Sequence, residues 1–445
     1  MGGMFLPGSP GHVLYNLALS AVLLIGAPFW IPWLLLARKR RKNFSERLGL
    51  RGFPAVPQPD GRPRIWVHAV SVGETLAAAP LLRLFRERAP GALLFVSNVT
   101  LTGREMSGKV LGGIVDAVFY FPFDLPWICG RLLDRLRPEV IVIVETEIWP
   151  NFLAACAARG IPSVIVNGRL SERSFHGYRR FRWFFAPVLR TFRAVAAQSK
   201  EDAERFIALG APREIVTVGG NLKFDVHPPT EKLTGLSSLL GGERESGVLW
   251  VVAGSTHEGE EMPVLRAFLS ARAQNPALKL LLAPRHPERF DAVEELVHRE
   301  GVPVSRRTLL ADGARGVDTP VLLLDSMGEL SGAYAEASLA FVGGSLVTKG
   351  GHNILEPAWH GVPTVVGPHM DNFREIANAF LSAGAVLQVS GERELSERFL
   401  QFAADPSSFA DTGRRARKLL ESFRGASERN AAVVFRALDR GGGAA

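Results

Sequence analysis

The chain has 445 residues, more than one hydrophobic core usually supports, because cores stop growing at about 250 to 300 residues. Hydrophobic residues make up 47% and charged residues 22%, which excludes a disordered or fibrous protein and supplies apolar material for two cores. The formal net charge of +8 indicates an anionic partner, and it does not choose among phosphate, nucleic acid and acidic lipid.

The first element in chain order is an uncharged apolar segment, Val13 to Ala37, which the basic cluster Arg38 to Lys42 follows at once. It is longer than the roughly 20 residues that cross the hydrocarbon core of a bilayer. A secretory signal has its positive charge before the apolar part, whereas here the charge comes after it. The positive-inside rule therefore predicts a membrane anchor in residues 1–42, with the rest of the chain cytoplasmic. A hairpin broken at Pro28 and Pro32, buried or interfacial, and a plain core helix are the alternatives.

Residues 43–225 alternate short apolar stretches with segments of helical periodicity, the pattern of a Rossmann-like, doubly wound α/β domain. A helix is predicted from Thr75 to Arg88. The predicted strands are Ile65–Val70, Leu93–Ser97, Val140–Val144, Ser163–Asn167 and Ala194–Gln198. Cys129 and Cys156 form no CxxC pair, so neither a disulfide framework nor a zinc site is indicated, and a reducing compartment fits best.

Residues 226–247 are rich in Pro, Gly and Ser and have no strand pattern, which predicts a linker. A second Rossmann-like domain is predicted from 248 to 445, with a last helix that can cross back to the first domain. Its predicted strands are Val248–Ala253, Leu278–Ala283, Val321–Leu324, Leu339–Val342 and Thr364–Val366. Two such domains in tandem predict a cleft between them, where ligands lie beyond the carboxyl ends of the strands.

The glycine-rich segment from Gly343 to Pro368 follows a predicted strand of the second domain, and nucleotide binding is one of two interpretations of it. Glycines let the backbone approach a ligand closely, and a helix starting near Asn353 would offer free amide groups to a phosphate. Glu356 is placed to accept hydrogen bonds from a ribose. In the alternative interpretation, this is a plain glycine-rich turn and Glu356 only complements the dipole of its own helix.

Two further loops follow strands of the second domain. Arg285, in PRHPER, can grip a phosphate or carboxylate with its planar guanidinium, although a solvated arginine explains it equally. In DSMGEL, Gly328 permits close approach and Met327 can pack beneath a base. The alternative for this loop is an ordinary helix cap by Asp325 or Ser326.

Two acidic segments come into question as metal sites. STHEGEE, Ser255 to Glu261, lacks the second histidine of HExxH, and a helix cap with an acidic first turn explains it at least as well. ETE, Glu145 to Glu147, has no His or Asp beside it, so direct contact with a substrate is favoured over a metal. The chain also contains no Asp-x-Asp sequence.

The segment from Arg169 to Arg193 interleaves arginine with aromatic residues. Such a mixture is typical of nucleic-acid binding through phosphates and stacked bases, or of a membrane surface with anionic headgroups. The apolar segment near the start of the chain favours the membrane. An amphipathic helix with a basic, solvated face is the alternative.

In the stretch WVHAVSVGET, Trp66 to Thr75, an apolar strand turns into a helix at Glu74. The helix dipole is expected to keep this carboxylate ionised, and an ionised carboxylate near an acceptor hydroxyl can act as a general base. The alternative is a first-turn glutamate that only complements its helix. His68 is expected to be a core residue of the strand.

Taken in order, a set of segments resembles one known family. They are WVHAVSVGET, FPFDLP, ETEIWPN, NGRLSERS, AAQSKEDAERFIALGA, GNLKFD, STHEGEE, PRHPERF, MGEL and FVGGSLVTKGGHNILEPAWHGVP. The family is that of the Kdo transferases, the 3-deoxy-D-manno-octulosonic acid transferases of lipid A and lipopolysaccharide assembly. The likeness extends from about Asn43 to about Glu375.

The resemblance implies a GT-B fold and transfer of Kdo from CMP-Kdo to the lipid A precursor, lipid IVA, at the cytoplasmic face of the inner membrane. It implies Glu74 as the proton acceptor in a single displacement with inversion, and Glu145 and Lys223 as groups that stabilise the transition state. It further implies no metal in the transfer step, no cofactor besides the donor, an anionic membrane surface as partner, and no nucleic acid. The residues implied to hold CMP are Pro284, Arg285, Met327, Gly328, Glu329, Asn353, Ile354, Leu355 and Glu356.

Two other functions stay open from the sequence. One is a GT-B enzyme of another kind, either a UDP-sugar transferase or a nucleotide-sugar epimerase. The other is a membrane-tethered scaffold or nucleic-acid-binding protein that uses the basic stretch from Arg169 to Arg193.

Overall fold

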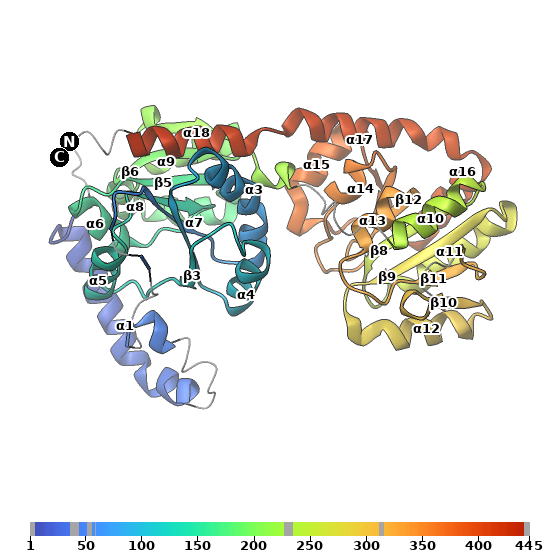
Figure 1. Cartoon of the computed structure of the whole chain (residues 1–445), viewed down its shortest axis with the longest axis horizontal. Coiled ribbons are helices and arrows are strands. Elements are labelled where there is room, and N and C mark those ends of the chain that lie inside the picture. Colours follow the sequence, from blue (N-terminus) through green and yellow to red (C-terminus); the bar gives the residue numbers. More distant parts are fainter. Residues whose placement is uncertain are drawn as a thin grey trace. The chain divides into compact units, whose positions relative to one another are not determined.

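The computed structural model describes residues 5–35, 44–50, 56–57, 59–226, 235–310 and 316–439, so the basic cluster Arg38–Lys42 lies outside the described residues. The chain divides into two compact units (Figure 1). Unit 1 comprises Met1–Val226 and Phe423–Ala445, and unit 2 comprises His227–Ser422.

In its described part, unit 1 contains a parallel sheet of seven strands in the order β3-β2-β1-β4-β5-β6-β7. The strands are β1 (Arg64–His68), β2 (Leu93–Asn98), β3 (Ala117–Tyr120), β4 (Val140–Val144), β5 (Ser163–Gly168), β6 (Phe192–Ala197) and β7 (Val216–Val218). The five predicted strands are confirmed. The strand order reverses between β1 and β4, and such a switch point is where doubly wound sheets bind ligands.

Helices cover both faces of this sheet, as a fully parallel sheet requires. They are α3 (Val72–Arg88), α4 (Leu101–Val110), α5 (Pro126–Leu136), α6 (Pro150–Ala158), α7 (Glu172–Arg180), α8 (Arg182–Leu189), α9 (Lys200–Leu209) and α18 (Ala426–Asp439), with short 3₁₀ turns η1 (Arg213–Ile215) and η2 (Leu222–Asp225). Ser71, Ser171 and Ser199 cap their helices by accepting backbone N–H bonds. The helix predicted from Thr75 to Arg88 is therefore confirmed as α3.

The C-terminal helix α18 packs in unit 1 against α3 and strands β4 to β6, although it follows unit 2 in the sequence (Figure 1). Its buried side chains Ala431 and Val434 belong to the same core as β1 and α3. The ring of Phe435 meets that of Phe85 edge-on at 5.5 Å. The two chain segments of unit 1 thus share one hydrophobic core.

In its described part, unit 2 also contains a parallel sheet of seven strands, in the order β10-β11-β9-β8-β12-β13-β14. The strands are β8 (Leu249–Thr256), β9 (Leu278–Pro284), β10 (Val304–Arg306), β11 (Val321–Leu323), β12 (Ala337–Val342), β13 (Thr364–Val366) and β14 (Leu387–Gln388). The five predicted strands are again confirmed. Here the strand order reverses between β8 and β12, which places a second switch point there.

The helices of unit 2 include one where a linker was predicted. They are α10 (Leu236–Glu245), α11 (Glu261–Gln274), α12 (Phe290–Arg299), α13 (Leu330–Ala335), α14 (Leu355–Trp359), α15 (Arg374–Ser382), α16 (Glu392–Ala404) and α17 (Ala410–Phe423), with 3₁₀ turns η4 (Pro287–Arg289), η5 (Arg307–Leu309), η6 (Asp371–Phe373) and η7 (Pro406–Phe409). The prediction that 226–247 is entirely linker is wrong. Leu236, Leu239 and Leu240 of α10 form a helical stripe that is buried in the core of unit 2.

The apolar N-terminal segment forms one helix, α1 (Pro10–Leu35), which is long and apolar enough to cross a membrane. Pro28 and Pro32 lie inside the helix and do not break it, so the hairpin alternative is wrong. Leu24 and Ile25 are 75% and 76% exposed, which excludes a plain core helix. The helix is attached to unit 1 near its start, where the Asn16 and Asn151 side chains exchange two hydrogen bonds of 2.8 and 3.0 Å.

Candidate active site

Glu74 and Glu145 lie at the switch point of unit 1. Glu145 comes directly after β4, and Glu74 stands in the first turn of α3, the helix that follows β1. Because β1 and β4 are hydrogen-bonded neighbours, their carboxyl ends bring the two loops to the same edge of the sheet. Glu145 and Glu147 both raise the pKa of Glu74, which places the three carboxylates within electrostatic reach of one another.

The Glu74 side chain closes the start of α3 in a capping box. Its Oε2 accepts the backbone N–H of Val70 at 2.7 Å, and its Oε1 accepts the Ser71 hydroxyl at 2.9 Å. Ser71 Oγ in turn accepts the backbone N–H of Glu74 at 3.4 Å. The structural role considered from the sequence is therefore present in the fold, and a catalytic role has to operate from this position.

Burial opposes the effect of the helix dipole, which was expected to keep Glu74 ionised. Burial raises the pKa of the Glu74 carboxyl to about 7, and the carboxylates of Glu145 and Glu147 add to this rise. The hydrogen bonds from Val70 and Ser71 lower the pKa, but they offset only part of the effect. At neutral pH this carboxyl is thus divided between its acidic and basic forms, the condition in which a group exchanges protons most readily.

Glu145 has a strained backbone, as do two other residues at the carboxyl ends of strands. Its φ is +63°, and those of Asn167 near the end of β5 and Ser255 near the end of β8 are +54° and +56°. Residues other than glycine seldom adopt this left-handed conformation, which costs about 1 to 3 kcal/mol and is concentrated at functional sites. These three residues lie at the carboxyl ends of strands in their own units, where the switch point of each unit also lies.

Lys223 lies in η2, which packs against α3, the helix that begins beside Glu74. Neighbouring polar side chains fix the backbone of this turn. Asn167 Oδ1 accepts the N–H of Leu222 at 2.9 Å, and Asn221 Oδ1 accepts the N–H of Lys223 at 3.0 Å. Glu74, Glu145 and Lys223 thus all lie in segments that follow strands of unit 1, and their catalytic roles stay predictions.

Within the described residues, no group of three or more His, Cys, Asp or Glu side chains is arranged to hold a metal ion. His68 is completely buried and stacks on Phe121 with 4.0 Å between ring centroids. Burial lowers its pKa to about 3, so it is a neutral residue of the core, as expected.

Glu260 organises the switch point of unit 2. Its side chain is fully buried and accepts four backbone N–H groups at 2.6 to 3.0 Å, those of His257, Gly344, Ser345 and Leu346. The STHEGEE segment is therefore neither a metal motif nor a plain helix cap. One of its glutamates holds the glycine-rich loop against the end of β8.

Several of the predicted CMP-binding residues converge beside this loop. Pro284 is the last residue of β9, and the exposed Arg285 follows it. Asn353 Nδ2 donates to Glu356 Oε1 at 3.1 Å, and the cation of Arg285 lowers the pKa of Glu356 against the stronger effect of burial, which raises it. Arg285, Asn353 and Glu356 thus form one polar group at the strand ends.

Ile354 and Leu355 are 1% and 2% exposed, so they can meet a ligand only through their backbone. The helix α14, which begins at Leu355, has only five residues, so its dipole contributes little to the binding of a phosphate.

The remaining predicted residues follow β11, the strand next to β9 in the sheet. Met327 is 61% exposed, and Gly328 has a φ of +90°, which suits glycine. Glu329 accepts a hydrogen bond from Arg307 at 3.1 Å. These side chains therefore lie at the same edge of the sheet as Arg285.

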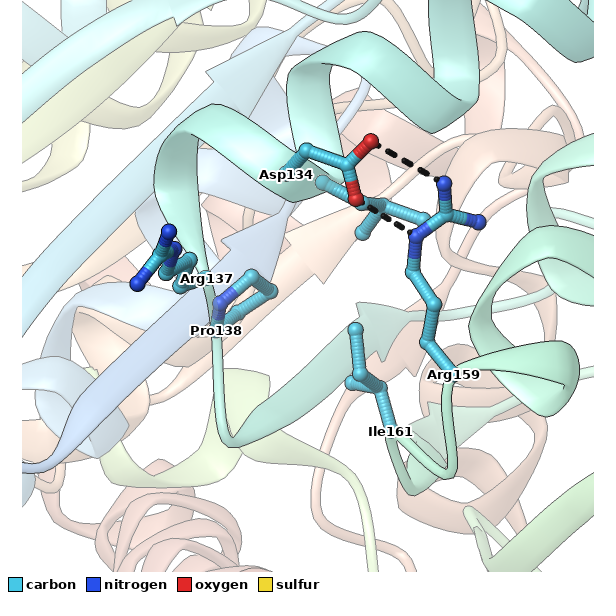
Figure 2. A pocket seen from close by; sticks show the side chains of 6 residues that line it. Asp134, Arg137, Pro138, Arg159 and Ile161 are labelled. Carbon is cyan, nitrogen blue, oxygen red and sulfur yellow. Dashed lines mark hydrogen bonds and ion pairs between the residues drawn. The ribbon is translucent and has the colours of Figure 1, made fainter.

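A pocket elsewhere in unit 1 takes no part in this site (Figure 2). It has a volume of about 360 Å³ and is lined by Leu133, Asp134, Arg137, Pro138, Arg159 and Ile161. The Asp134–Arg159 ion pair spans part of it at 2.8 Å. Pro138 and Ile161 precede β4 and β5, so the pocket lies at the amino ends of these strands, opposite Glu145.

The basic aromatic segment forms α7 and α8. Phe181, between the two helices, is 50% exposed, and Trp183, in α8, is 60% exposed. Exposed aromatic rings beside arginines are typical of a membrane surface. The face that Tyr178 and Phe184 turn inward packs against the core of unit 1, so the segment is also an amphipathic pair of helices.

Sequence reasoning missed three residues that organise the site, Asn167, Glu260 and Asn430. Each is a buried polar side chain that holds backbone groups distant in the sequence. The position of Asn167 at the carboxyl end of a predicted strand was a signal that could have revealed it. Asn430 lies within helical sequence and Glu260 lies in the turn before α11, and nothing in either segment marks a tertiary contact.

The family model described as 3-Deoxy-D-manno-octulosonic-acid transferase (kdotransferase) matches residues 42–226. The 3-deoxy-D-manno-octulosonic acid transferase of Haemophilus influenzae is 36% identical over 392 residues, which cover 87% of this chain and 90% of that protein. The one of Bordetella pertussis is 34% identical over 436 residues, which cover 94% and 97%.

Among solved structures, the UDP-GlcNAc 2-epimerase from Neisseria meningitidis bound to UDP-GlcNAc has a TM-score of 0.55 at 13% identity. The match covers 85% of this chain and 100% of that chain. At this level of identity the likeness shows the fold alone. Together with the two doubly wound sheets, it confirms the GT-B fold class.

Proposed function

The chain belongs to the family of 3-deoxy-D-manno-octulosonic acid (Kdo) transferases, and we propose that it transfers Kdo from CMP-Kdo to the lipid A precursor, lipid IVA. It is a glycosyltransferase of lipopolysaccharide biosynthesis. The observation that carries the proposed mechanism is the position of the Glu74 carboxyl at the switch point of unit 1, where burial raises its pKa to about 7.

In the proposed reaction, a hydroxyl group of the acceptor attacks the anomeric carbon of Kdo. The new carbon–oxygen bond forms as the bond to the CMP phosphate breaks, so that the configuration inverts, and Glu74 takes the hydroxyl proton. Each Glu74 oxygen accepts one hydrogen bond in the fold, and a carboxylate oxygen can accept two. The capping box therefore leaves room for the acceptor hydroxyl.

We assign electrostatic roles in the transition state to the two other predicted catalytic residues, Lys223 and Glu145. The cationic Lys223 offsets the negative charge that grows on the departing phosphate. Glu145 contributes a carboxylate beside Glu74 and raises its pKa towards neutrality, which keeps the base matched to its task.

For the donor, we propose that the polar group of Arg285, Asn353 and Glu356 holds CMP. Arg285 is exposed and suited to a phosphate, and Glu356 can accept hydrogen bonds from the ribose. The exposed Met327 supplies an apolar surface for the base, and Gly328 lets the backbone approach it closely. The remaining contacts are assigned to Pro284, Glu329, Ile354 and Leu355.

We further propose that transfer needs no metal and no cofactor besides the donor. CMP-Kdo has one phosphate, which leaves less charge for a metal to bridge than a nucleoside diphosphate sugar does. The chain also lacks an Asp-x-Asp sequence. Full activity after treatment with EDTA would support this, and activity that returns only with added Mg²⁺ would refute it.

The proposed location is the cytoplasmic face of the inner membrane. The exposed apolar surface of α1 supports insertion into a bilayer, and the cluster Arg38–Lys42 after it in the sequence supports the cytoplasmic side. Trp183 and the arginines of α7 and α8 support contact with anionic headgroups. We propose no nucleic-acid partner.

The test is release of CMP from CMP-Kdo by the purified full chain, with and without lipid IVA, and mass spectrometry of the lipid product. We expect release that depends on the lipid and a product heavier by one or more Kdo units. No release from folded protein would overturn the proposal. Tighter binding of UDP than of CMP in a competition assay would favour a UDP-sugar enzyme instead.

A further inference from the structure

Two histidines meet at the switch point of unit 2, beside the residues assigned to CMP. The Nε2 atoms of His257 and His352 lie 2.8 Å apart, and the two rings are parallel to within 2°. A hydrogen bond between two ring nitrogens needs an N–H on one ring and a lone pair on the other. The contact therefore exists only while at least one ring is neutral at Nε2.

The fold holds this pair in place from both sides. Glu260 binds the backbone of His257 and the glycine-rich loop that leads to His352. Gly344 lies beneath the rings with a φ of +67°, and a Cβ atom there would be 2.9 Å from Cδ2 of His352. A residue with a side chain is thus excluded at position 344, where the two imidazoles approach each other.

The surroundings of the pair are cationic. The ring of His286 meets that of His257 edge-on at 5.3 Å between centroids. Burial lowers the pKa of His257, and His286, Lys349 and Arg285 lower it further. Burial likewise lowers the pKa of His352 to about 4. The cationic side chains of Lys349 and Arg285 favour binding of a negative charge at the pair.

The nearby carboxylates are occupied. Glu260 is taken up by backbone N–H groups, and Glu258 and Glu261 each lie 3.3 Å from Arg289. Glu288 approaches His286 only to 3.9 Å. Within the part of the chain that the structure describes, Arg285 and Lys349 form no ion pair. Among the described residues, the charge of Lys349 therefore has no carboxylate partner, whereas the Arg285 cation acts on the Glu356 carboxyl.

We propose that the His257–His352 pair, with Lys349, binds an anionic oxygen group of the donor, either its phosphate or the carboxylate of its sugar. An oxyanion accepts the N–H of one ring and favours protonation of the other, which replaces the contact between the rings. This inference rests on the proposed function, since it names the part of the donor that unit 2 recognises. A purely structural pair would stabilise the loop and leave donor binding unchanged.

The test uses the full chain with His257→Asn, His352→Asn and the exposed Lys349→Met, the last of which puts folding least at risk. The control is His298→Asn, an exposed histidine on α12. Calorimetric titration with CMP and with cytidine shows whether the phosphate is bound. If the pair binds the phosphate, the three variants lose about tenfold in CMP affinity, cytidine binding does not change, and the control matches the wild type.

If the sugar carboxylate is the bound group, CMP affinity is unchanged and the KM for CMP-Kdo rises by about tenfold in the same variants. Folded variants that keep both the CMP affinity and the KM of the wild type would overturn the inference. That outcome is distinct from failure of the proposed function, in which the wild-type chain itself would release no CMP.

Discussion

The side chain of Asn430 accepts the backbone N–H of Asn167 at 3.0 Å, although the two residues are 263 positions apart in the sequence. Asn430 lies on the C-terminal helix α18, and Asn167 is the second-last residue of β5 and has a left-handed conformation. The side chain of Asn167 makes the next contact, because its Oδ1 accepts the backbone N–H of Leu222 at 2.9 Å. The last helix of the chain thus supports the turn that contains Lys223.

This connection predicts that Asn430→Ala weakens both stability and catalysis. The buried N–H of Asn167 loses its partner, which costs about 1 to 3 kcal/mol in the free energy of unfolding. The Lys223 turn loses support, so we expect a lower kcat with an unchanged affinity for CMP. Urea unfolding, turnover and CMP titration measure the three quantities. Glu428→Ala, on an exposed ion pair of the same helix, should stay within about 0.5 kcal/mol of the wild type.

Glu74→Gln should bind CMP normally and transfer Kdo at least about two orders of magnitude more slowly, as loss of a general base typically does. Glutamine can still accept the N–H of Val70, so the helix start is preserved. In the wild type, kcat should rise with pH and level off above about 7, because only the ionised form takes a proton. Near-normal turnover by the variant would remove Glu74 from this role.

The raised pKa of Glu74 also predicts how stability depends on pH. The folded-state pKa of about 7 lies above the ordinary value of 4.5, so folding favours the protonated form. Its contribution is complete below pH 4.5 and is lost as the pH rises to about 7. The Tm of Glu74→Gln relative to the wild type should therefore increase between pH 5 and pH 8 in calorimetric scans. A constant difference across this range would contradict the raised pKa.

The strands could be predicted from the sequence where both faces of the sheet are covered. β4 is VIVIV with every residue buried, so it appears as a continuous apolar stretch. β7 and β14, which were missed, have two or three residues each and lie at the sheet edges, where partly exposed side chains give no such signal. The helix α10 was also missed, because its glycines and serines are typical of a linker although three of its leucines are buried in the core.

The candidate site was predictable only in part. Residues that directly follow strands, such as Glu145 and Arg285, could be located because parallel strands end at one edge of the sheet. The contact between Glu260 and Gly344 joins residues 84 positions apart, and no periodicity within one helix contains that information. The direction of the pKa shift of Glu74 was also beyond the sequence, because it depends on how deeply the fold buries a first-turn carboxyl.

Two changes in α1 should separate its attachment to unit 1 from its contact with a membrane. Asn16→Ala removes one half of the amide pair with the buried Asn151, and we expect a loss of about 1 to 3 kcal/mol in stability with membrane binding retained. Leu24→Asn alters a side chain that is 75% exposed, so stability should stay constant. Flotation with anionic vesicles should show weaker binding for Leu24→Asn only. Equal binding by both variants would mean that this part of α1 does not enter the bilayer.

Glu260→Gln should destabilise unit 2 and abolish CMP binding, because one carboxylate oxygen becomes an NH₂ group that faces backbone N–H donors. The two oxygens accept two N–H groups each, so at least two buried donors lose their acceptor, and each such loss costs about 1 to 3 kcal/mol. The matched control is Glu258→Gln, two residues earlier, whose side chain is 88% exposed and should tolerate the same change. Thermal unfolding and CMP titration of both variants make the comparison. A Glu260→Gln protein with the stability and CMP affinity of its control would show that the glycine-rich loop holds its shape without Glu260.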